Sequence, residues 1–573
     1  MASQAALRAS FQQLVVCQQV QRPTGNRSFA PRRAPAAPVQ QAQRGAGWPL
    51  AAVRADQATE TADSAAIELI AEITGGVDQA HAAALQRSAA TAMEALSGGG
   101  AASDESLQLK QKVLASVVDL QKGLLERETE VRLLLLAALC GEHLLLLGPP
   151  GTAKSELSRR LAKLTGGKYF ERLLTRFSVP EELFGPLSMR GLENDQYVRQ
   201  IDGYLPTAEV AFIDEIFKAN SAILNALLTL LNERLFDNGN ARFEVPLLCL
   251  VGASNELPES EELDALYDRF LIRRMVAQVS SAQLATLARL AAGTLDEGDR
   301  MSSDEATAGA VPELTMDDFR NTAGAAYGTV DVPESVIDLL TGVRNYLQDK
   351  CEPPVYVSDR RFMKSIKMLQ ARAGQGLAGA GWGQLWWSPP GLTHGLTVAA
   401  WADGRTAVTE YDCLLLEFVL GQRPDDAHKV KAFLLETIAS DPGLQQTELV
   451  FLGLFGRACR VLEGANAQEL EEARRECGSL VELLDLRCGS LAATLDGGFP
   501  ELRSTAWQSD ASVQAAVQAL TPQTTENRKR GEDLLREALL LQAALEKPVP
   551  AAVLERLLPK RFKQYQKGIS GRA

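Results

Sequence analysis

The 573-residue sequence is poor in the residues that build metal and disulfide frameworks. It has four histidines and eight cysteines, and no two cysteines form a CxxC pair. We therefore expect neither a zinc site nor a disulfide scaffold, and a reducing compartment fits this composition. No apolar run reaches the roughly 18 residues that a membrane-spanning helix requires, so we expect no transmembrane segment. The formal net charge of −13 argues against a general nucleic-acid binder.

Acidic residues are missing from the first 55 positions, which carry seven arginines and no lysine. This composition is typical of an organelle transit peptide and is explained less well by a disordered basic tail. The tripeptide VRA at 53–55 resembles a chloroplast-type cleavage site, so we expect residues 1–55 to direct the chain to the chloroplast stroma, with the mitochondrial matrix as the alternative. Residues 56–105 are rich in Ala, Gly, Ser and Thr. They predict a flexible linker with one short helix around Ala65–Ile73.

The sequence LLLLGPPGTAKS, at Leu144–Ser155, changes from an apolar run to a glycine-rich turn that ends in Lys-Ser. It predicts a buried strand followed by a helix, and backbone N–H groups at such a corner favour an anion. We interpret the turn as a P-loop for ATP and Mg²⁺, in which Lys154 reaches the β- and γ-phosphates and Ser155 binds the Mg²⁺. A plain glycine-proline turn is the alternative, because Ala153 stands where the pattern asks for glycine. The predicted nucleotide-binding residues are Gly148, Pro149, Pro150, Gly151, Thr152, Ala153, Lys154 and Ser155.

Two later apolar runs also end in polar residues. Val210–Ile213 is followed by Asp214 and Glu215. Leu247–Val251 leads to Asn255. Ligands of open α/β sheets bind at the carboxyl ends of the strands. We therefore expect Asp214 to hold Mg²⁺ through water, Glu215 to orient the attacking water, and Asn255 to reach that water or the γ-phosphate. Adjacent acids can instead open a helix, and a lone asparagine can be a turn residue.

Five longer segments lie around these motifs: TRFSVPEELFGPLS at 175–188, GYLPTAEVAFIDEIFKAN at 203–220, NALLTLLNERLF at 225–236, ASNELPE at 253–259 and LYDRFLIR at 266–273. Together with GPPGTAKS, they make the stretch from about Gly123 to Arg274 resemble a MoxR-type AAA+ ATPase, most closely the RavA (regulatory ATPase variant) subgroup. That family commonly has Ala before the P-loop lysine.

The resemblance implies roles for individual residues and an assembly. Asp214 and Glu215 resemble the Walker B pair, and Asn255 resembles the sensor-1 residue. Arg269 resembles the arginine finger that reaches the nucleotide of the neighbouring subunit, with Arg273 as a second candidate and a surface or lid salt bridge as the alternative. The family further implies a ring, which we expect to be a homo-hexamer, a protein client, and a partner that carries a von Willebrand factor A domain.

Two insertions resemble the helix-2 and pre-sensor-1 inserts of this AAA+ branch, which line the pore face of the ring. Pro186–Pro206 predicts a short β-rich insert. Leu235–Val245 predicts a hairpin, because Asp-Asn-Gly-Asn stands between alternating residues.

The sequence after residue 279 predicts a helical lid over 280–424. Ser358 is the expected N-cap of one lid helix. The segment it opens resembles the sensor-2 segment, and we favour Arg360 over Arg361 as the arginine that contacts the γ-phosphate; helix-start salt bridging is the alternative. Residues 374–398 contain three of the six tryptophans amid Gly and Pro. We interpret them as an unstructured insertion or a gene-model artefact, with an exposed aromatic docking loop as the alternative.

The predicted fold is an α/β P-loop AAA+ core over residues 106–279, with a parallel sheet flanked by helices, then the helical lid and a mostly α-helical C-terminal region over 425–573. The predicted activity is ATP hydrolysis by in-line attack of water on the γ-phosphate, used to remodel or mature a protein complex. The alternatives are a nucleotide-gated scaffold with little turnover and a motor subunit of the magnesium-chelatase type.

Overall fold

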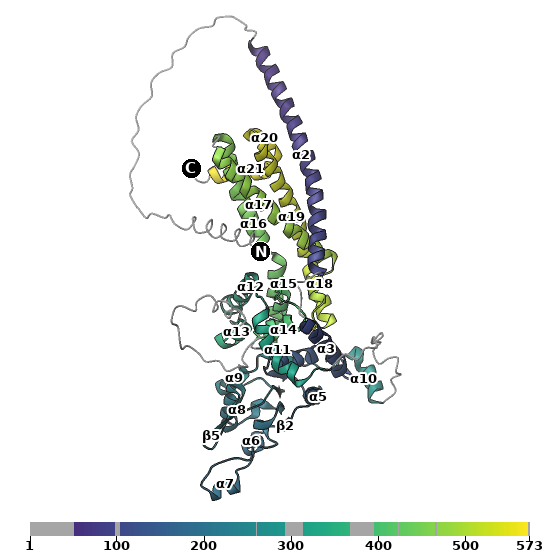
Figure 1. Ribbon diagram of the computed structural model, residues 1–573, viewed down its shortest axis with the longest axis vertical. Coiled ribbons are helices and arrows are strands. Elements are labelled where there is room, and N and C mark those ends of the chain that lie inside the picture. The colour runs from purple at the N-terminus through teal and green to yellow at the C-terminus, as the bar shows by residue number, and fades with distance from the viewer. Residues whose placement is uncertain are drawn as a thin grey trace, which may run out of the picture. The chain divides into compact units, whose positions relative to one another are not determined.

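The computed structural model describes residues 51–97, 104–258, 260–292, 313–366, 395–421, 423–464 and 467–570. The chain divides into two compact units, residues 1–65 and 66–573. Among the described residues, the first unit contains only the start of α2 (Ala51–Ser97), and the second contains the remaining elements (Figure 1). The expected transit peptide and the expected insertion at 374–398 lie outside the described residues, apart from 51–55 and 395–398.

Five parallel strands form the central sheet, in the order β2-β3-β6-β1-β7. All three expected strands are present, and the third begins at Cys249, two residues later than expected. The strands are β1 (Leu144–Leu147), β2 (Tyr169–Leu173), β3 (Val210–Asp214), β6 (Cys249–Ser254) and β7 (Ile272–Met275).

Helices cover both faces of this sheet, which explains its apolar strands. Leu144 and Leu146 of β1 join a core shared with α4, whereas Leu145 and Leu147 join a second core shared with α8. A strand buried on both faces is apolar at every position, so the run of four leucines marks a central strand. The helices around the sheet are α3 (Asp104–Gln121), α4 (Glu128–Leu139), α5 (Lys154–Thr165), α8 (Ser221–Glu233) and α9 (Glu261–Tyr267).

The two insertions have different outcomes. The hairpin is confirmed as β4 (Leu235–Asn238) and β5 (Ala241–Glu244), which pair antiparallel. The prediction of a β-rich insert over Pro186–Pro206 is wrong: the segment contains the short helix α7 (Met189–Glu193) and a single isolated bridge. The Ser188 hydroxyl accepts a hydrogen bond from the Gly191 N–H, and this N-cap favours a helix. The polar residues that follow lack the apolar-polar alternation of a strand.

The lid helices other than α10 (Leu284–Ala291) contribute residues to the core on the α4 side of the sheet, whereas α10 has no buried residue. The Ser358 hydroxyl accepts a hydrogen bond from the N–H of Arg361 at 3.2 Å, so the expected N-cap is confirmed. The lid elements are α10 (Leu284–Ala291), α11 (Met316–Thr329), α12 (Glu334–Asn345), α13 (Asp359–Ile366), α14 (Gly395–Ala402) and η6 (Glu410–Phe418).

The C-terminal region is helical, as expected. One helix, α19, joins two separate cores: Ala516 and Leu520 pack in the core of the lid, and Leu534 and Leu541 pack in a second core. The helices are α15 (Pro424–Ser440), α16 (Pro442–Gly464), α17 (Ala467–Asp496), α18 (Pro500–Arg503), α19 (Asp510–Glu546), α20 (Ala551–Leu557) and α21 (Pro559–Ser570).

The linker prediction for residues 56–105 is wrong, because α2 runs through most of that segment. Alanine is the strongest helix former, and Ile73 and Val77 lie one turn apart and are buried in the second C-terminal core. Asp78 forms an ion pair with Arg536 of α19 at 2.9 Å. We call residues 66–97 of α2, together with α16, α17 and α19–α21, the accessory bundle.

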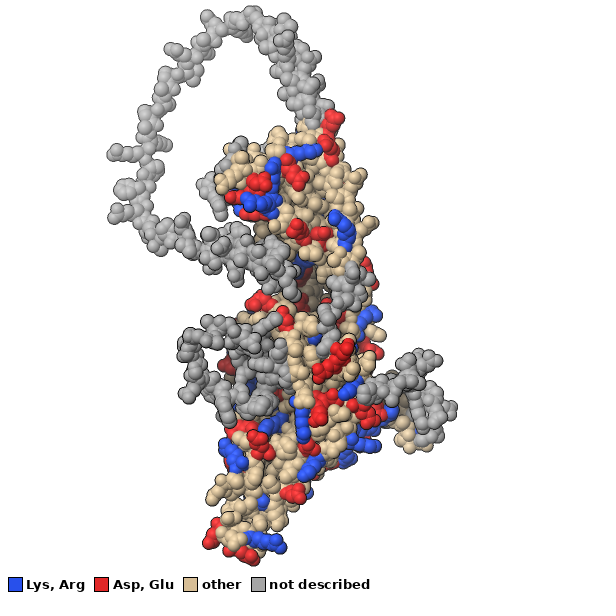
Figure 2. All heavy atoms as spheres, in the orientation of Figure 1, with Lys and Arg blue, Asp and Glu red and all other residues tan. Residues whose placement is uncertain are grey.

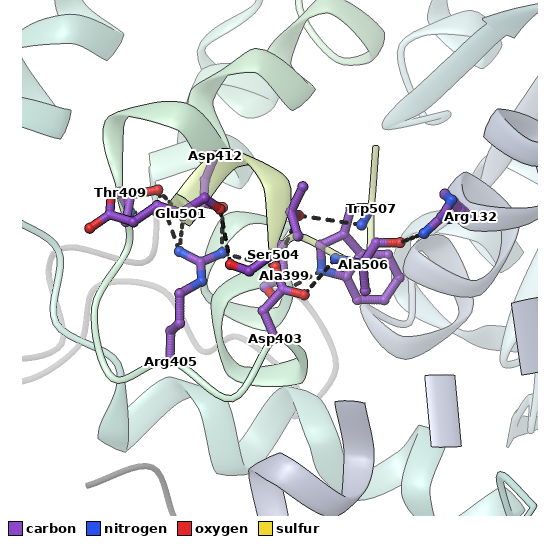
Figure 3. Close-up of polar contacts among 11 residues, drawn as sticks. Arg132, Ala399, Asp403, Arg405, Thr409, Asp412, Glu501, Ser504, Ala506 and Trp507 are labelled. Carbon is purple, nitrogen blue, oxygen red and sulfur yellow. Dashed lines mark hydrogen bonds and ion pairs between the residues drawn. The ribbon is translucent and has the colours of Figure 1, made fainter. Parts of the chain in front are cut away.

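A buried group of polar side chains fastens the α18–α19 corner to the lid (Figure 3). Arg405 donates to Asp412 at 2.6 and 2.7 Å and to Asp403 at 3.0 Å. Asp403 in turn accepts from the N–H of Ala506 at 2.7 Å, and the Trp507 indole N–H donates to the carbonyl of Ala399 at 2.9 Å. We call Asp403, Arg405 and Asp412 the lid node.

The surface of the molecule carries both signs of charge. Lys and Arg side chains are mixed with Asp and Glu on the face drawn in Figure 2. Among the described helices, none is both long enough and apolar enough to cross a membrane.

Candidate active site

The carboxyl ends of β1, β3 and β6 bring the predicted site residues to one edge of the sheet. β1 and β6 run parallel with Leu147 opposite Ser254, and β3 and β6 run parallel with Ile213 opposite Gly252. The P-loop follows β1, Glu215 follows β3, and Asn255 follows β6. Topology therefore places three segments that are far apart in sequence next to one another, as expected for an open α/β sheet.

The P-loop backbone has the conformation that an anion cradle needs. Gly148 has φ +143°, and a Cβ atom there would lie 2.2 Å from the carbonyl oxygen of Val276, so only glycine fits. Gly151 and Ala153 also have positive φ, at +78° and +66°. Ala153 immediately precedes the first residue of α5, so the loop ends at the N-terminus of a helix, where free N–H groups favour an anion.

Lys154 is a buried cation whose partners are neutral. It is 7% exposed, and its Nζ donates to the carbonyl oxygens of Gly148 at 2.7 Å and Pro149 at 2.9 Å. Burial lowers its pKa, and the charges of Asp214 and Glu215 oppose that shift. A buried ammonium group that contacts only carbonyls fits a site that receives phosphate oxygens. Ser155 lies half-buried in the first turn of α5, where it can bind Mg²⁺ together with Asp214.

The Walker B candidates and Asn255 lie together. The Asn255 Nδ2 donates to Oε1 of Glu215 at 2.6 Å. The other carboxylate oxygen of Glu215 lies 3.3 Å from Nζ of Lys218. Glu215 has φ +53°, and its N–H donates to the side chain of Asp214 at 3.0 Å. The left-handed backbone is unusual for a glutamate and aims the two adjacent acids differently.

Arg127 supports the P-loop and carries no sequence motif. It is buried at the N-cap of α4, and it donates to the carbonyls of Thr152 at 3.2 Å and Ala277 at 2.7 Å. These two bonds join the loop to the segment that follows β7. Sequence reasoning missed this residue because a single arginine before an apolar helix gives no signal of its long-range partners.

Arg269 and Arg360, the predicted arginines, form no hydrogen bond or ion pair with the P-loop in the described part of the chain. Arg269 is half-buried; its Nη1 donates to the carbonyl of Ala265 at 2.7 Å, and its Nε atom is buried and lacks a hydrogen-bond partner among the described residues. Burial lowers the pKa of Arg269, and the charge of Arg360 lowers it further. Arg360 is exposed on α13.

Arg273 is not available as a second arginine finger. It is 7% exposed, its guanidinium stacks 3.7 Å from the centre of the Tyr267 ring, and it donates to the carbonyls of Tyr267, Phe270 and Gly421. Burial lowers its pKa to about 9, and the nearby charge of Arg361 contributes. Arg273 stabilises the interior of its own chain, so the prediction of Arg273 as a second arginine-finger candidate is corrected.

Comparison with known proteins gives the family. A model of the MoxR domain in the MoxR-vWA-beta-propeller ternary systems matches residues 111–316, and a model of the AAA lid domain matches 335–375 and 394–434. An uncharacterized protein of Methanocaldococcus jannaschii is 36% identical over 335 residues, which cover 58% of this chain and 78% of that protein. The chain belongs to the MoxR family of AAA+ ATPases.

Two further relatives show how much of this MoxR-family chain is shared. A second uncharacterized protein of Methanocaldococcus jannaschii is 43% identical over 256 residues, or 44% of this chain, which spans 63% of that protein's length. Protein MoxR of Paracoccus denitrificans is 29% identical over 294 residues, which cover 49% of this chain and 79% of that protein. The candidate site residues up to Arg269 lie inside the MoxR match and Arg360 inside the lid match, whereas the accessory bundle lies outside both.

Proposed function

We infer that this MoxR-family chain hydrolyses ATP between the subunits of a homo-hexameric ring and uses the reaction to remodel or mature a protein complex. The observation that carries the proposal is the contact of 2.6 Å between Asn255 and Glu215, beside a P-loop lysine whose hydrogen-bond partners within the described ranges are carbonyls. The site thus contains a carboxylate oriented by an amide, next to a cradle that fits phosphate.

Each residue at this edge has a chemical task in the proposal. The loop N–H groups and Lys154 bind the phosphates, and Ser155 and Asp214 hold Mg²⁺, which neutralises phosphate charge when it is bound. Glu215 orients the water and accepts its proton, and Asn255 fixes the carboxylate that does so.

The positions of the two arginines support hydrolysis between subunits. Arg269 and Arg360 lie close enough to influence each other electrostatically, and neither contacts the P-loop of its own chain in the described residues. Neighbouring cations favour a further anion, and in the proposal a nucleotide held by the next subunit supplies it. An arginine presented in this way raises turnover by about 10³–10⁵-fold.

We also propose a partner, a subgroup and a cellular compartment for the chain, from its family and its sequence. The matching model is named for systems that pair a MoxR domain with a vWA protein, which supports a partner carrying a von Willebrand factor A domain. We place the chain in the RavA-like subgroup on the segments at 175–188 and 266–273. The acid-free first 55 residues favour the chloroplast stroma, with the mitochondrial matrix as the alternative.

The test is the ATPase rate of the full chain as a function of protein concentration, beside Arg269→Ala. We expect the rate per subunit to rise with assembly, as followed by sedimentation, and to fall by about 10³-fold or more in the variant. The variant should still bind a fluorescent ATP analogue, because its own P-loop is intact. A fully assembled, ATP-bound wild type with background turnover would contradict the proposal and favour the nucleotide-gated scaffold.

A further inference from the structure

The junction between α9 and the lid contains a carboxylate that joins the two domains. Oδ1 of Asp268 accepts hydrogen bonds from Nη2 of Arg361 at 2.7 Å and from the Ser358 hydroxyl at 2.8 Å. Both donors belong to the lid: Ser358 caps α13, and Arg361 lies in the first turn of that helix with 3% of its surface exposed. Asp268 therefore fixes one end of α13 to the nucleotide-binding domain.

The two arginines proposed to act on the neighbouring nucleotide flank this contact in the sequence. Arg269 follows Asp268, and Arg360 precedes Arg361. Because Arg361 is bound to Asp268, the residues next to them in the sequence, Arg269 and Arg360, are held in the same region of the junction. The charge of Arg360 lowers the pKa of Arg269 after burial does, and the Asp268 carboxylate offsets part of this repulsion.

We propose that Asp268 is a positioning residue, which holds Arg269 and Arg360 together so that both face one anion, the polyphosphate of the nucleotide bound by the next subunit. The idea rests on the proposed hydrolysis between subunits. Charged donors that are fixed in advance stabilise developing charge without reorganisation, and misplacing such a group by about 1 Å costs on the order of 10²-fold in rate. The Asp268 side chain contacts Ser358 and Arg361 and, among the described residues, no part of the P-loop, so it acts through the arginines rather than on the substrate.

The chain offers a matched control on the same helix. Lys364, one turn after Arg361, forms an ion pair of 2.7 Å with Glu142, which lies just before β1 and is almost fully buried. Both pairs fix α13 to the nucleotide-binding domain, and both leave a buried cation when the acid is neutralised. Only the Asp268 pair adjoins Arg269 and Arg360 in the sequence.

The test compares Asp268→Asn with Glu142→Gln in the full chain, at saturating ATP and at a concentration where sedimentation shows complete assembly. We expect Asp268→Asn to lower kcat by about 10–100-fold while the affinity for a fluorescent ATP analogue changes by less than about 2-fold. Glu142→Gln should lower the unfolding temperature to a similar extent but keep kcat within about 3-fold of the wild type. Ser358→Ala, which removes one hydrogen bond to Asp268, is the milder variant and should lower kcat by about 3–10-fold.

A double-mutant cycle shows whether Asp268 acts through Arg269. If it does, Asp268→Asn adds less than about 2-fold to the loss already caused by Arg269→Ala, because the positioned group is gone. Equal losses of kcat in Asp268→Asn and Glu142→Gln, or a full additional loss in the Arg269→Ala background, would overturn the inference and leave the proposed hydrolysis intact. A wild type without assembly-dependent turnover would overturn both.

Discussion

The nucleotide edge of the sheet and the lid node both contain buried charges, but they satisfy them differently. In the lid node, Arg405 lies between two carboxylates whose side chains are 0% and 4% exposed. These carboxylates also accept hydrogen bonds from the Thr409 and Thr505 hydroxyls and from the N–H groups of Thr409 and Ala506. At the nucleotide edge, the hydrogen-bond partners of the Lys154 side chain among the described residues are backbone carbonyls, and Glu215 contacts an amide and a half-exposed lysine. Charges that are neutralised within the chain hold the fold, whereas charges with weak internal partners are available to a ligand.

The largest expected effect is a loss of kcat at the nucleotide edge, without a matching loss of stability. Glu215→Gln keeps the size of the side chain and its acceptor for Asn255, but the amide cannot take a proton from water. We expect kcat to fall by about 10²–10⁴-fold. The free energy of unfolding, measured with urea, should change by less than about 1 kcal/mol. A large loss in the free energy of unfolding would instead mean that Glu215 stabilises the fold, as the residues of the lid node do.

The lid node should show the opposite result. Asp412→Ala removes the bidentate partner of Arg405 and leaves a buried guanidinium with one carboxylate, Asp403. We expect a loss of about 3–5 kcal/mol in the free energy of unfolding. The protein that remains folded should keep the kcat of the wild type, since the node lies outside the nucleotide edge. If kcat falls in the folded fraction, the lid node also affects the nucleotide edge through the position of the lid.

What could be predicted from the sequence depended on whether a residue's role is visible in its sequence neighbours or only in its distant partners. The P-loop, the two acids at the end of β3 and the asparagine after β6 were predictable, because nucleotide chemistry needs particular residue types at strand ends. Each of these motifs can be recognised from a few consecutive residues. The hairpin was predictable from its turn residues. These signals are all local, and the structure contains the corresponding strands and turns.

The residues that were missed depend on distant partners. Arg127 contacts Ala277, Asp268 contacts Arg361, and α2 packs against helices more than 300 residues further along the chain. An alanine-rich segment resembles a linker until the apolar surface that it covers is known. Periodicity therefore identified single helices but gave no information on the pairs of elements that bury them.

Alkylation of buried cysteines can compare the stability of the nucleotide core with that of the accessory bundle. Cys140 and Cys249 lie in the first, and Cys477 and Cys488 lie in the second. Burial raises the pKa of Cys249, Cys477 and Cys488 to about 12, so iodoacetamide should react only after local opening. An ATP analogue at about 100 times its Kd should slow the labelling of the core cysteines by up to about 100-fold.

The labelling rate of Cys477 and Cys488 should stay unchanged if the bundle opens independently of the nucleotide core. Mass spectrometry of the labelled peptides measures all four rates in one sample. Equal protection of the four cysteines would show that both regions open as a single cooperative unit and that α19 transmits binding from the lid to the bundle.

The smallest effect should come from a surface pair that is bidentate, like the pair of Arg405 and Asp412 in the lid node. Arg159 donates through Nε and Nη2 to both carboxylate oxygens of Glu171, at 2.8 and 2.7 Å, but its side chain is 52% exposed. Water competes for these charges and screens them, so Glu171→Gln should shift the urea midpoint too little to resolve. A loss as large as that of Asp412→Ala would mean that hydrogen-bond geometry, rather than burial, gives the lid node its strength.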